Sequence, residues 1–459
     1  MSSYPRQELP YFDSATRKGR HTLENSEQLY EFARQYLVGG VSSSIRLAQA
    51  YGNRPFYMAR GEGSKVYGVD GREYIDLCTS HGASLLGHKH PGIVAALHQA
   101  AEMGVLCSYE TEFQGALAKK IVEMIPCAEL VRFAGSGTET TMHTIRLARE
   151  YTGKDKILKF TGHFHGYHDY VLFERDAPSP TAQAAESGLY PVTDGIPKGM
   201  DKYVTVVPDN DLEAFETAIR QQKDEIAAVI LEPVHYNAGC IIPSREYIQQ
   251  LRRITAENDI LLIFDEVLAG FRMAPGGAQE YFGVTPDLCT LGKAVGAGLP
   301  LSVICGKWEI MSHIKPLGNV QHSGTYNGSL PSVLAGLAAL EAYSSPGFYE
   351  HINQLGQHLY TGITEIATRL GVKARVQGLG ARFGIYFGIE EEVTSFKQAQ
   401  AVDMKMNNCF IETAWKNGVY FHDYGSSKGA KHHGFSAAHT LADMDRALEG
   451  IETAFKAIR

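Results

Sequence analysis

Short apolar runs alternate with amphipathic stretches through the middle of the chain. In the amphipathic stretches, for example residues 211–222 and 244–258, apolar positions recur at the spacing of one helix face. Alternating strands and helices predict an α/β fold with a mostly parallel sheet that helices cover on both faces. The apolar runs that we assign to this sheet are residues 131–133, 156–160, 204–207, 226–231, 261–264, 287–291 and 301–305.

The two ends of the chain have other patterns. Near the N-terminus, the stretch VYGVDGREYIDL, residues 66–77, has two strand-like halves on either side of the turn dipeptide Asp70-Gly71, which predicts a hairpin. After the last apolar run, long helical stretches precede a glycine-broken strand region, at residues 332–343, 348–370 and 378–389.

These changes of pattern predict the domain organisation. We expect residues 76–330 to form a large domain and residues 331–459 to form a smaller α+β domain, which the N-terminal residues 1–75 join. We also expect the polar residues 1–30 to lie along a surface or a partner.

Composition and charge exclude several classes of function. The 459 residues carry 43 Lys and Arg against 51 Asp and Glu, a net charge of −8, which disfavours nucleic acid and anionic membranes as partners. No stretch approaches the roughly 20 apolar residues that cross a bilayer, and the polar start lacks the apolar core of a signal peptide. We therefore expect a cytoplasmic protein.

The 7 cysteines are scattered without a C-x-x-C pair, so we expect reduced thiols.

Residues that follow the apolar runs are the first candidates for a site, because parallel sheets bind ligands beyond the carboxyl ends of their strands. Ser136-Gly137-Thr138-Glu139 follows the first run and has the S-x-x-E spacing of a helix start. Backbone N–H groups at such a start can bind a phosphate, which the helix dipole favours. The alternative is an ordinary capped helix without a ligand.

Two charged residues follow later runs. Asp265 ends the run at 261–264, and a carboxylate there needs a proton or a positive charge to offset its desolvation. Lys293 follows the run at 287–291 among small residues and glycines. A partly desolvated amine loses affinity for its proton and becomes a nucleophile toward carbonyls. A capping aspartate and a surface lysine on a glycine turn are the alternatives.

The stretch HFHGYHDY, residues 163–170, places three histidines and several aromatic rings after the run at 156–160. No carboxylate or cysteine set at ligand spacing accompanies the histidines, so we expect no metal site. Phe164 is better suited to stack on a planar ring, and the alternative is an aromatic loop that packs on itself. Together the four motifs predict one ligand with a phosphate, a protonated ring nitrogen and an aldehyde, which describes pyridoxal 5′-phosphate.

The chain resembles the fold-type I, class III aminotransferases, a family that includes glutamate-1-semialdehyde 2,1-aminomutase. The resemblance runs from about Val38 to the C-terminus, and three stretches carry it: DEV-x-x-GFR at residues 265–272, TLGK ending at Lys293, and HSGTYNG at residues 322–328. It implies an enzyme with a large domain and a smaller α+β domain that uses pyridoxal 5′-phosphate (PLP). The implied substrates are a small-molecule amino donor and a keto acid.

The resemblance also implies roles for single residues. Lys293 would form the Schiff base with the cofactor and then carry a proton to and from the substrate, while Asp265 would keep the ring nitrogen protonated. Arg46 would hold the substrate carboxylate through two hydrogen bonds, unless it is a surface arginine. Thr325 would reach the phosphate from a neighbouring subunit, which implies an obligate homodimer with active sites at the interface. The other implied cofactor residues are Ser136, Gly137 and Thr138 at the phosphate, Phe164 and Val267 on the two ring faces, Asn237 near the phenolic oxygen, and His165.

Some stretches depart from the aminomutase. Ser80-His81-Gly82-Ala83 stands where its relatives carry a tryptophan followed by Gly-Pro, and residues 177–195 replace the Gly-Ser-Gly loop that retains the aminomutase intermediate. HSGTYNG is also more similar to β-amino-acid aminotransferases. We therefore expect an aminotransferase that moves the amino group of a β-amino acid or related amino-carboxylate to a keto acid by ping-pong chemistry. The alternatives are the aminomutase and a racemase or epimerase of the same fold.

Interpretations from other classes are weaker. The glycines of GKAVGAGLP do not follow the G-x-G-x-x-G spacing of a dinucleotide-binding dehydrogenase. A scaffold without catalysis is compatible with the fold, but it has no use for a desolvated lysine. In the C-terminal AKHHGFSAAHT, His432 and His433 could shape specificity, and we favour a solvated loop instead.

Overall fold

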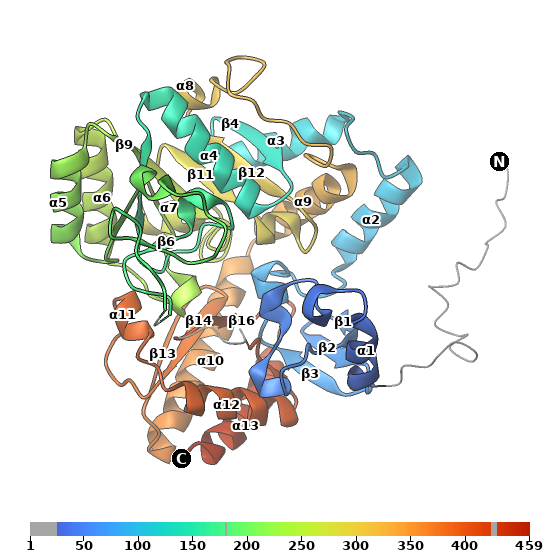
Figure 1. Cartoon of the computed structure of the whole chain (residues 1–459). Helices are drawn as coiled ribbons and strands as arrows, with labels where there is room; N and C mark the ends of the chain where they lie inside the picture. Colours follow the sequence, from blue (N-terminus) through green and yellow to red (C-terminus); the bar gives the residue numbers. More distant parts are fainter. Residues whose placement is uncertain (1–24, 180, 424–428) are drawn as a thin grey trace, which may run out of the picture.

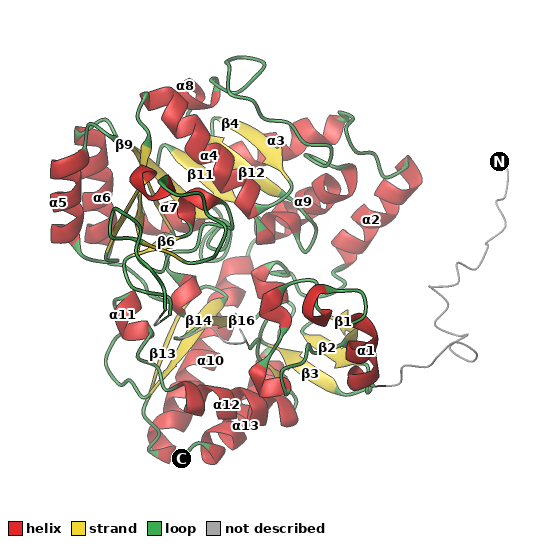
Figure 2. Cartoon of the chain, in the orientation of Figure 1, coloured by secondary structure: helices red, strands yellow, loops and turns green. Residues whose placement is uncertain are grey.

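The computed structural model describes residues 25–179, 181–423 and 429–459, and its largest sheet, which has seven strands, lies in the upper half of the molecule in Figure 1 and Figure 2. Six strands run in one direction, and β12 is antiparallel to both of its neighbours. Each strand overlaps one predicted apolar run, so the predicted α/β fold with a mostly parallel sheet is confirmed. In spatial order the strands are β4 (Leu130–Ala134), β12 (Ser302–Gly306), β11 (Leu288–Leu291), β10 (Leu261–Glu266), β9 (Ile226–Leu231), β5 (Lys156–Phe160) and β8 (Val204–Val207).

The sheet is apolar on both faces because helices cover both. In β9, which is buried along its whole length, Ala228 and Ile230 share an apolar cluster with α4 (Gly137–Thr152). The alternate residues Val229 and Leu231 pack with α5 (Leu212–Gln222) and α6 (Arg245–Glu257). Successive side chains of a strand point to opposite faces, so a strand between two helical layers is apolar at every position.

The lower part of the molecule in Figure 1 combines both ends of the chain. The predicted hairpin is confirmed as β2 (Lys65–Gly68) and β3 (Glu73–Asp76), and β1 (Met58–Glu62) pairs with β2. On its other side β3 pairs in parallel with β15 (Val419–Tyr420), so one small sheet joins residues that precede the large sheet to residues that follow it. The exact domain boundaries stay a prediction.

The C-terminal residues also form a three-stranded antiparallel sheet, β13 (Ala374–Leu379), β14 (Arg382–Phe387) and β16 (His432–Gly434). His432 and His433 lie in β16 and are buried. The interpretation of this stretch as a solvated loop is therefore wrong, because pairing with β14 removes both histidines from solvent.

The remaining helices surround these sheets. The predicted helical stretches at 332–343 and 348–370 are present as α9 (Leu330–Tyr343) and α10 (Phe348–Leu370). Most of the polar segment 1–30 lies outside the described residues.

Within the described ranges, none of the helices combines the length and the apolar character that a membrane span needs. The other elements are α1 (Ser26–Ala33), α2 (Pro91–Met103), α3 (Glu112–Met124), α7 (Gly277–Phe282), α8 (Trp308–Met311), α11 (Phe396–Ala399), α12 (Met404–Lys416), α13 (Leu441–Ala457), β6 (Phe173–Glu174) and β7 (Tyr190–Pro191).

The backbone at Gly82 lies against two arginine side chains, those of Arg272, which follows β10, and of Arg382, which begins β14. The Gly82 carbonyl accepts a hydrogen bond from the buried Arg272, and Arg382 donates to the nearby Cys78 carbonyl at 3.1 Å. A Cβ at Gly82 would lie 2.5 Å from Arg382 Nη2 and 2.7 Å from Arg272 Nη2. Its φ of 87° also favours glycine.

We expect Gly82→Ala to lower the free energy of unfolding more than Gly71→Ala. Both glycines have a φ near 85°, at 87° and 84°, but a Cβ at Gly71 meets no atom within 4 Å. Gly71→Ala should cost about 1–2 kcal/mol for the left-handed backbone, and Gly82→Ala about 1–3 kcal/mol more for displaced arginines. Thermal or urea unfolding of both variants measures the difference. Equal losses would show that the arginines do not enforce glycine at this position.

Candidate active site

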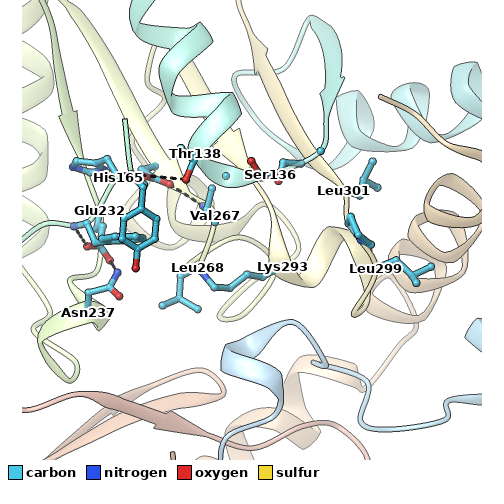
Figure 3. A pocket seen from close by; sticks show the side chains of 18 residues that line it. Ser136, Thr138, His165, Glu232, Asn237, Val267, Leu268, Lys293, Leu299 and Leu301 are labelled. Carbon is cyan, nitrogen blue, oxygen red and sulfur yellow. Dashed lines mark hydrogen bonds and ion pairs between the residues drawn. The ribbon is translucent and has the colours of Figure 1, made fainter. Parts of the chain in front are cut away.

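The predicted cofactor residues meet in one pocket of about 300 Å³ at the carboxyl ends of the parallel strands (Figure 3). All of them except Thr325 line it, together with Lys293. The walls come from the segments that follow β4, β5, β9, β10 and β11, as expected for a parallel sheet. The lining residues are 135–138, 164–167, Glu232, Asn237, Asp265, Val267, Leu268, Lys293 and 299–302.

The start of α4 forms one end of the pocket. Ser136 is the N-cap, and its hydroxyl accepts a hydrogen bond of 3.2 Å from the Glu139 N–H, so the predicted helix start is confirmed. Thr138 Oγ1 accepts a hydrogen bond from the Tyr167 N–H, which ties the helix start to the loop after β5. The first N–H groups of a helix have no carbonyl partner within it, and the helix dipole adds positive potential. This end of the pocket therefore favours an anion such as phosphate.

Asp265 lies in β10 at its carboxyl end and is held by three neighbouring groups. Its Oδ2 is 2.8 Å from His165 Nδ1, and its Oδ1 accepts hydrogen bonds of 3.1 Å from the Thr290 hydroxyl and the Val267 N–H. On the other side of the His165 ring, Nε2 is buried and has no hydrogen-bond partner among the residues that the structure describes. These contacts fix the direction in which the carboxylate faces a ligand in the pocket.

Glu232 is a lining residue that we did not predict. It follows β9 directly, is buried, and accepts hydrogen bonds of 2.8 Å from the Phe164 N–H and the Asn237 side-chain amide. It therefore positions two residues that we had assigned to the cofactor. Its position after a fully apolar run is the same signal that identified Asp265.

Lys293 begins the short 3-10 turn that follows β11. Its φ is 43°, in the left-handed region that non-glycine residues adopt rarely and often at functional sites. Burial, reinforced by the Arg272 guanidinium, lowers the pKa of its amine to about 8, while Asp265 and Glu232 oppose this effect. Close to neutral pH the amine can therefore reach its nucleophilic, uncharged form.

Arg46 and Thr325 lie outside the pocket lining. Arg46 ends a 3-10 turn and is exposed. Burial, with a smaller contribution from the Arg46 charge, lowers the pKa of His81 to about 2 and that of His422 to about 4. The residue before Arg46 is in direct contact with one of these histidines, because His422 Nε2 is 3.1 Å from the Ile45 carbonyl oxygen. Thr325 is also exposed, and its carbonyl accepts a hydrogen bond of 3.0 Å from the Ser108 hydroxyl.

Comparison with known proteins identifies the family. A family model described as aminotransferase class-III matches residues 47–453. A curated glutamate-1-semialdehyde 2,1-aminomutase from Methanocaldococcus jannaschii is 40% identical over 436 residues, which cover 94% of this chain and 99% of that protein. Among solved structures, an omega-transaminase from Sphaerobacter thermophilus has a TM-score of 0.86 at 30% identity and covers 96% of this chain and 99% of its own. A β-phenylalanine aminotransferase from Variovorax paradoxus has a TM-score of 0.82 at 29% identity, with 94% of each chain covered.

The chain belongs to the class III aminotransferases, which are fold-type I enzymes that use PLP. The pocket fits this group. Its helix start favours a phosphate, its fixed carboxylate suits a cationic ring nitrogen, and its buried amine suits an aldehyde. At Gly137 a Cβ would lie 3.0 Å from Val267 Cγ1, so glycine there preserves the space between the helix start and Val267.

We expect the capture of the PLP aldehyde by cofactor-free protein to rise with pH through a midpoint near 8, because burial lowers the pKa of Lys293 to about 8. The neutral amine is the nucleophile, so the rate is low below this pH and levels off above it. Asp265→Asn removes a charge that favours the ammonium form, and its midpoint should move to lower pH. Stopped-flow absorbance measures the rate, and N-acetyl-lysine, with a pKa of about 10.4, is the control. A midpoint near that of the control would contradict the expectation.

Proposed function

We propose that this protein is an aminomutase that acts on glutamate 1-semialdehyde or a closely related amino-carboxylate. The observation that carries the proposal is the 40% identity with a curated aminomutase over 94% of the chain, combined with a pocket that Lys293 and Asp265 both line. Such an enzyme moves an amino group between neighbouring carbons of one molecule and needs no second keto acid. The comparison thus favours the alternative that the sequence left open over the aminotransferase that we expected.

The pocket residues would share the binding of PLP. The start of α4 would bind the phosphate, and Phe164 and Val267 would hold the ring. Asp265, oriented by His165, would pair with the protonated ring nitrogen, and Asn237 would approach the phenolic oxygen. When bound, the cofactor supplies an electron sink for the negative charge that develops at a substrate carbon.

Lys293 would bind the cofactor aldehyde and then move the proton at the substrate. Its amine, with a pKa of about 8, can accept and release a proton near neutral pH. An aminomutase needs such transfers at two neighbouring carbons, and the four-carbon stem of one lysine can serve both positions.

The charges near Lys293 support a substrate with a carboxylate. The 3-10 turn that carries His81 contacts the turn that carries Lys293. Apart from burial, the groups that most lower the pKa of His81 are His422 and Arg382. With pKa values of about 2 and about 4, His81 and His422 are uncharged near neutral pH, so the positive charge of this region comes from its arginines. These guanidinium groups favour an anionic group of a ligand, and Arg46, which is exposed, would bind the carboxylate.

An intermolecular aminotransferase is the second candidate. The segment 177–195 stands in place of the retaining loop, and its described residues do not line the pocket. An intermediate that this segment does not enclose could be exchanged for a second substrate. The similarity to the Sphaerobacter thermophilus omega-transaminase, at 30% identity over 96% of the chain, also fits this activity. A β-amino acid or related amino-carboxylate would then be the donor and a keto acid the acceptor.

We infer that the enzyme is a homodimer with active sites at the interface. Thr325 is exposed on its own subunit and would complete the phosphate end of the pocket on the other subunit. Close to it the side chains of Val105, Tyr109 and Tyr326 are 55%, 69% and 70% exposed, and the bond between Ser108 and Thr325 joins the two segments that carry them. Exposed apolar and aromatic residues of this kind are typical of a subunit interface.

We expect the holoprotein to convert glutamate 1-semialdehyde into its 5-amino-4-oxopentanoate isomer over many turnovers without a second substrate. Chromatography of the product with and without 2-oxoglutarate measures this, and Lys293→Ala is the inactive control. An aminotransferase would instead stop after about one turnover per site until a keto acid or an amino donor is added. If that pattern is seen with a β-amino acid as donor, the second candidate replaces the first.

Arg46→Lys should raise the KM for the carboxylate substrate about 10- to 100-fold, because a charged hydrogen-bond pair worth about 1.5–3 kcal/mol loses its bidentate geometry. The absorbance of the bound cofactor should not change, since Arg46 lies outside the pocket lining. Arg60→Lys is the matched control, because Arg60 is an exposed arginine that pairs with Glu62 on the surface. An unchanged KM in the Arg46 variant would remove Arg46 from the substrate site.

A further inference from the structure

Three buried cysteines that are far apart in the sequence meet in the core of the large sheet. Cys127 precedes β4, Cys289 lies in β11 and Cys305 lies in β12, and each is at most 2% exposed with a free thiol. Their sulfur atoms lie within 4.8 Å of one another. Cys289 and Cys305 are direct partners across the two antiparallel strands, so the backbone fixes their proximity.

The spacing of these sulfur atoms fits a metal ion. A tetrahedral zinc ion with Zn–S distances of about 2.3 Å places its thiolates about 3.8 Å apart. Sulfur atoms that already lie within 4.8 Å of one another need shifts of at most about 1 Å to reach this arrangement. No change of strand register is required for such shifts.

A buried carboxylate lies beside the thiols. Glu266 ends β10, is 0% exposed, and its Oε1 is 3.9 Å from the Cys289 sulfur. Its closer partners are neutral: the Ala278 N–H donates to Oε2 at 2.6 Å, and the Gln279 amide donates to Oε1 at 3.0 Å. A buried carboxylate with neutral partners is costly unless a proton or a cation balances its charge.

Gln279 holds two of these four groups in place. Its side-chain amide donates to Glu266, and its carbonyl oxygen accepts a hydrogen bond of 3.0 Å from the Cys127 N–H. Gln279 lies in α7 and is 1% exposed, so both contacts are shielded from water. Metal ligands are commonly oriented by outer partners of this kind.

In the other groups of possible ligands within the described ranges, a nitrogen or sulfur atom that could bind a metal is already in a hydrogen bond. The contacts are His163 Nδ1 with the Glu232 N–H, His143 Nδ1 with Arg146, and the Cys78 sulfur with the His81 N–H. The oxygens of Glu266 also accept hydrogen bonds, but each carboxylate oxygen has a second lone pair for a metal ion. In the cysteine cluster, the thiols of Cys289 and Cys305 reach carbonyl oxygens only at 3.7 Å. Loss of a thiol proton on metal binding would therefore remove only weak contacts.

We propose that Cys127, Cys289, Cys305 and Glu266 form a closed structural site for one zinc ion. The three sulfur atoms lie within 4.8 Å of one another, and the Glu266 carboxylate, 3.9 Å from the Cys289 sulfur, would move toward the ion to become the fourth ligand. Sulfur donors select zinc over magnesium or calcium. Binding releases the three thiol protons, and the proton of Glu266 where it carries one, to solvent as the chain folds. The proposal does not depend on the reaction that the enzyme catalyses.

The ion would stabilise the strands that carry the active site. Glu266 follows Asp265 in the sequence, and Cys289 lies four residues before Lys293. The site would therefore fix β10, β11 and β12 relative to the segment before β4. The groups that line the PLP pocket do not include any of the four ligands, so the ion acts on the site through strand position.

The test is the metal content of purified holoprotein, measured by plasma mass spectrometry after expression in zinc-containing medium without an affinity tag. We expect about one zinc per chain, and Cys305→Ser should lose it. Cys240→Ser is the matched control, because Cys240 is also 0% exposed but lies outside the cluster. Refolding in Co²⁺ should add sulfur-to-cobalt charge-transfer absorption to wild type and to the control variant, and not to Cys305→Ser.

Counting thiols in denaturant with a chelator separates the remaining outcomes. Zinc in wild type with all 7 thiols reactive after chelation supports the site. Metal below about 0.1 per chain together with 7 reactive thiols would show ordinary core cysteines and overturn the proposal. Two thiols fewer would indicate a disulfide and overturn it as well. Wild-type protein alone decides these outcomes, so a variant that fails to fold does not weaken the test.

Discussion

The active site depends on taking one amine and two carboxylates out of water at the same edge of the sheet. Each of these groups is costly to bury alone, and together they offset one another. Burial and Arg272 lower the pKa of Lys293 to about 8, and Asp265 and Glu232 limit this fall. The reactivity of Lys293 therefore depends on its neighbours more than on its local sequence.

The register of the strands decides which groups reach the pocket. β9, β10 and β11 are neighbours in the sheet, and Asp265 is paired with Thr290, which donates a hydrogen bond to it. Because successive residues of a strand point to opposite faces, Asp265 lines the pocket while Glu266 points toward the cysteines. A slip of one residue would exchange the two carboxylates. The same strand thus supplies a wall of the proposed PLP pocket on one side and a ligand of the proposed metal site on the other.

Local patterns in the sequence were sufficient for the strands and helices of the large sheet, and for bringing Asp265 and Lys293 to one pocket. Both residues directly follow or end an apolar run, and the sheet geometry brings such positions together. Glu232 carries the same signal. The burial of His432 depends on pairing with β14, which is remote in the sequence, and no periodic pattern indicates it. The cysteine cluster combines positions 127, 289 and 305, so ligand spacing along the chain cannot reveal it.

The choice between an aminomutase and an aminotransferase depends on few residues, whereas identity is averaged over the whole chain. Identity of 40% over 436 residues shows the family and does not locate the residues that decide between the two reactions. The reactions differ in whether an intermediate stays in the site, and we expect the turn with His81 and the segment 177–195 to be among the places where this chain departs from the aminomutase. The overall similarity to a curated aminomutase therefore supports the proposed activity as a whole, whereas the turn with His81 and the segment 177–195 bear on whether the intermediate is exchanged.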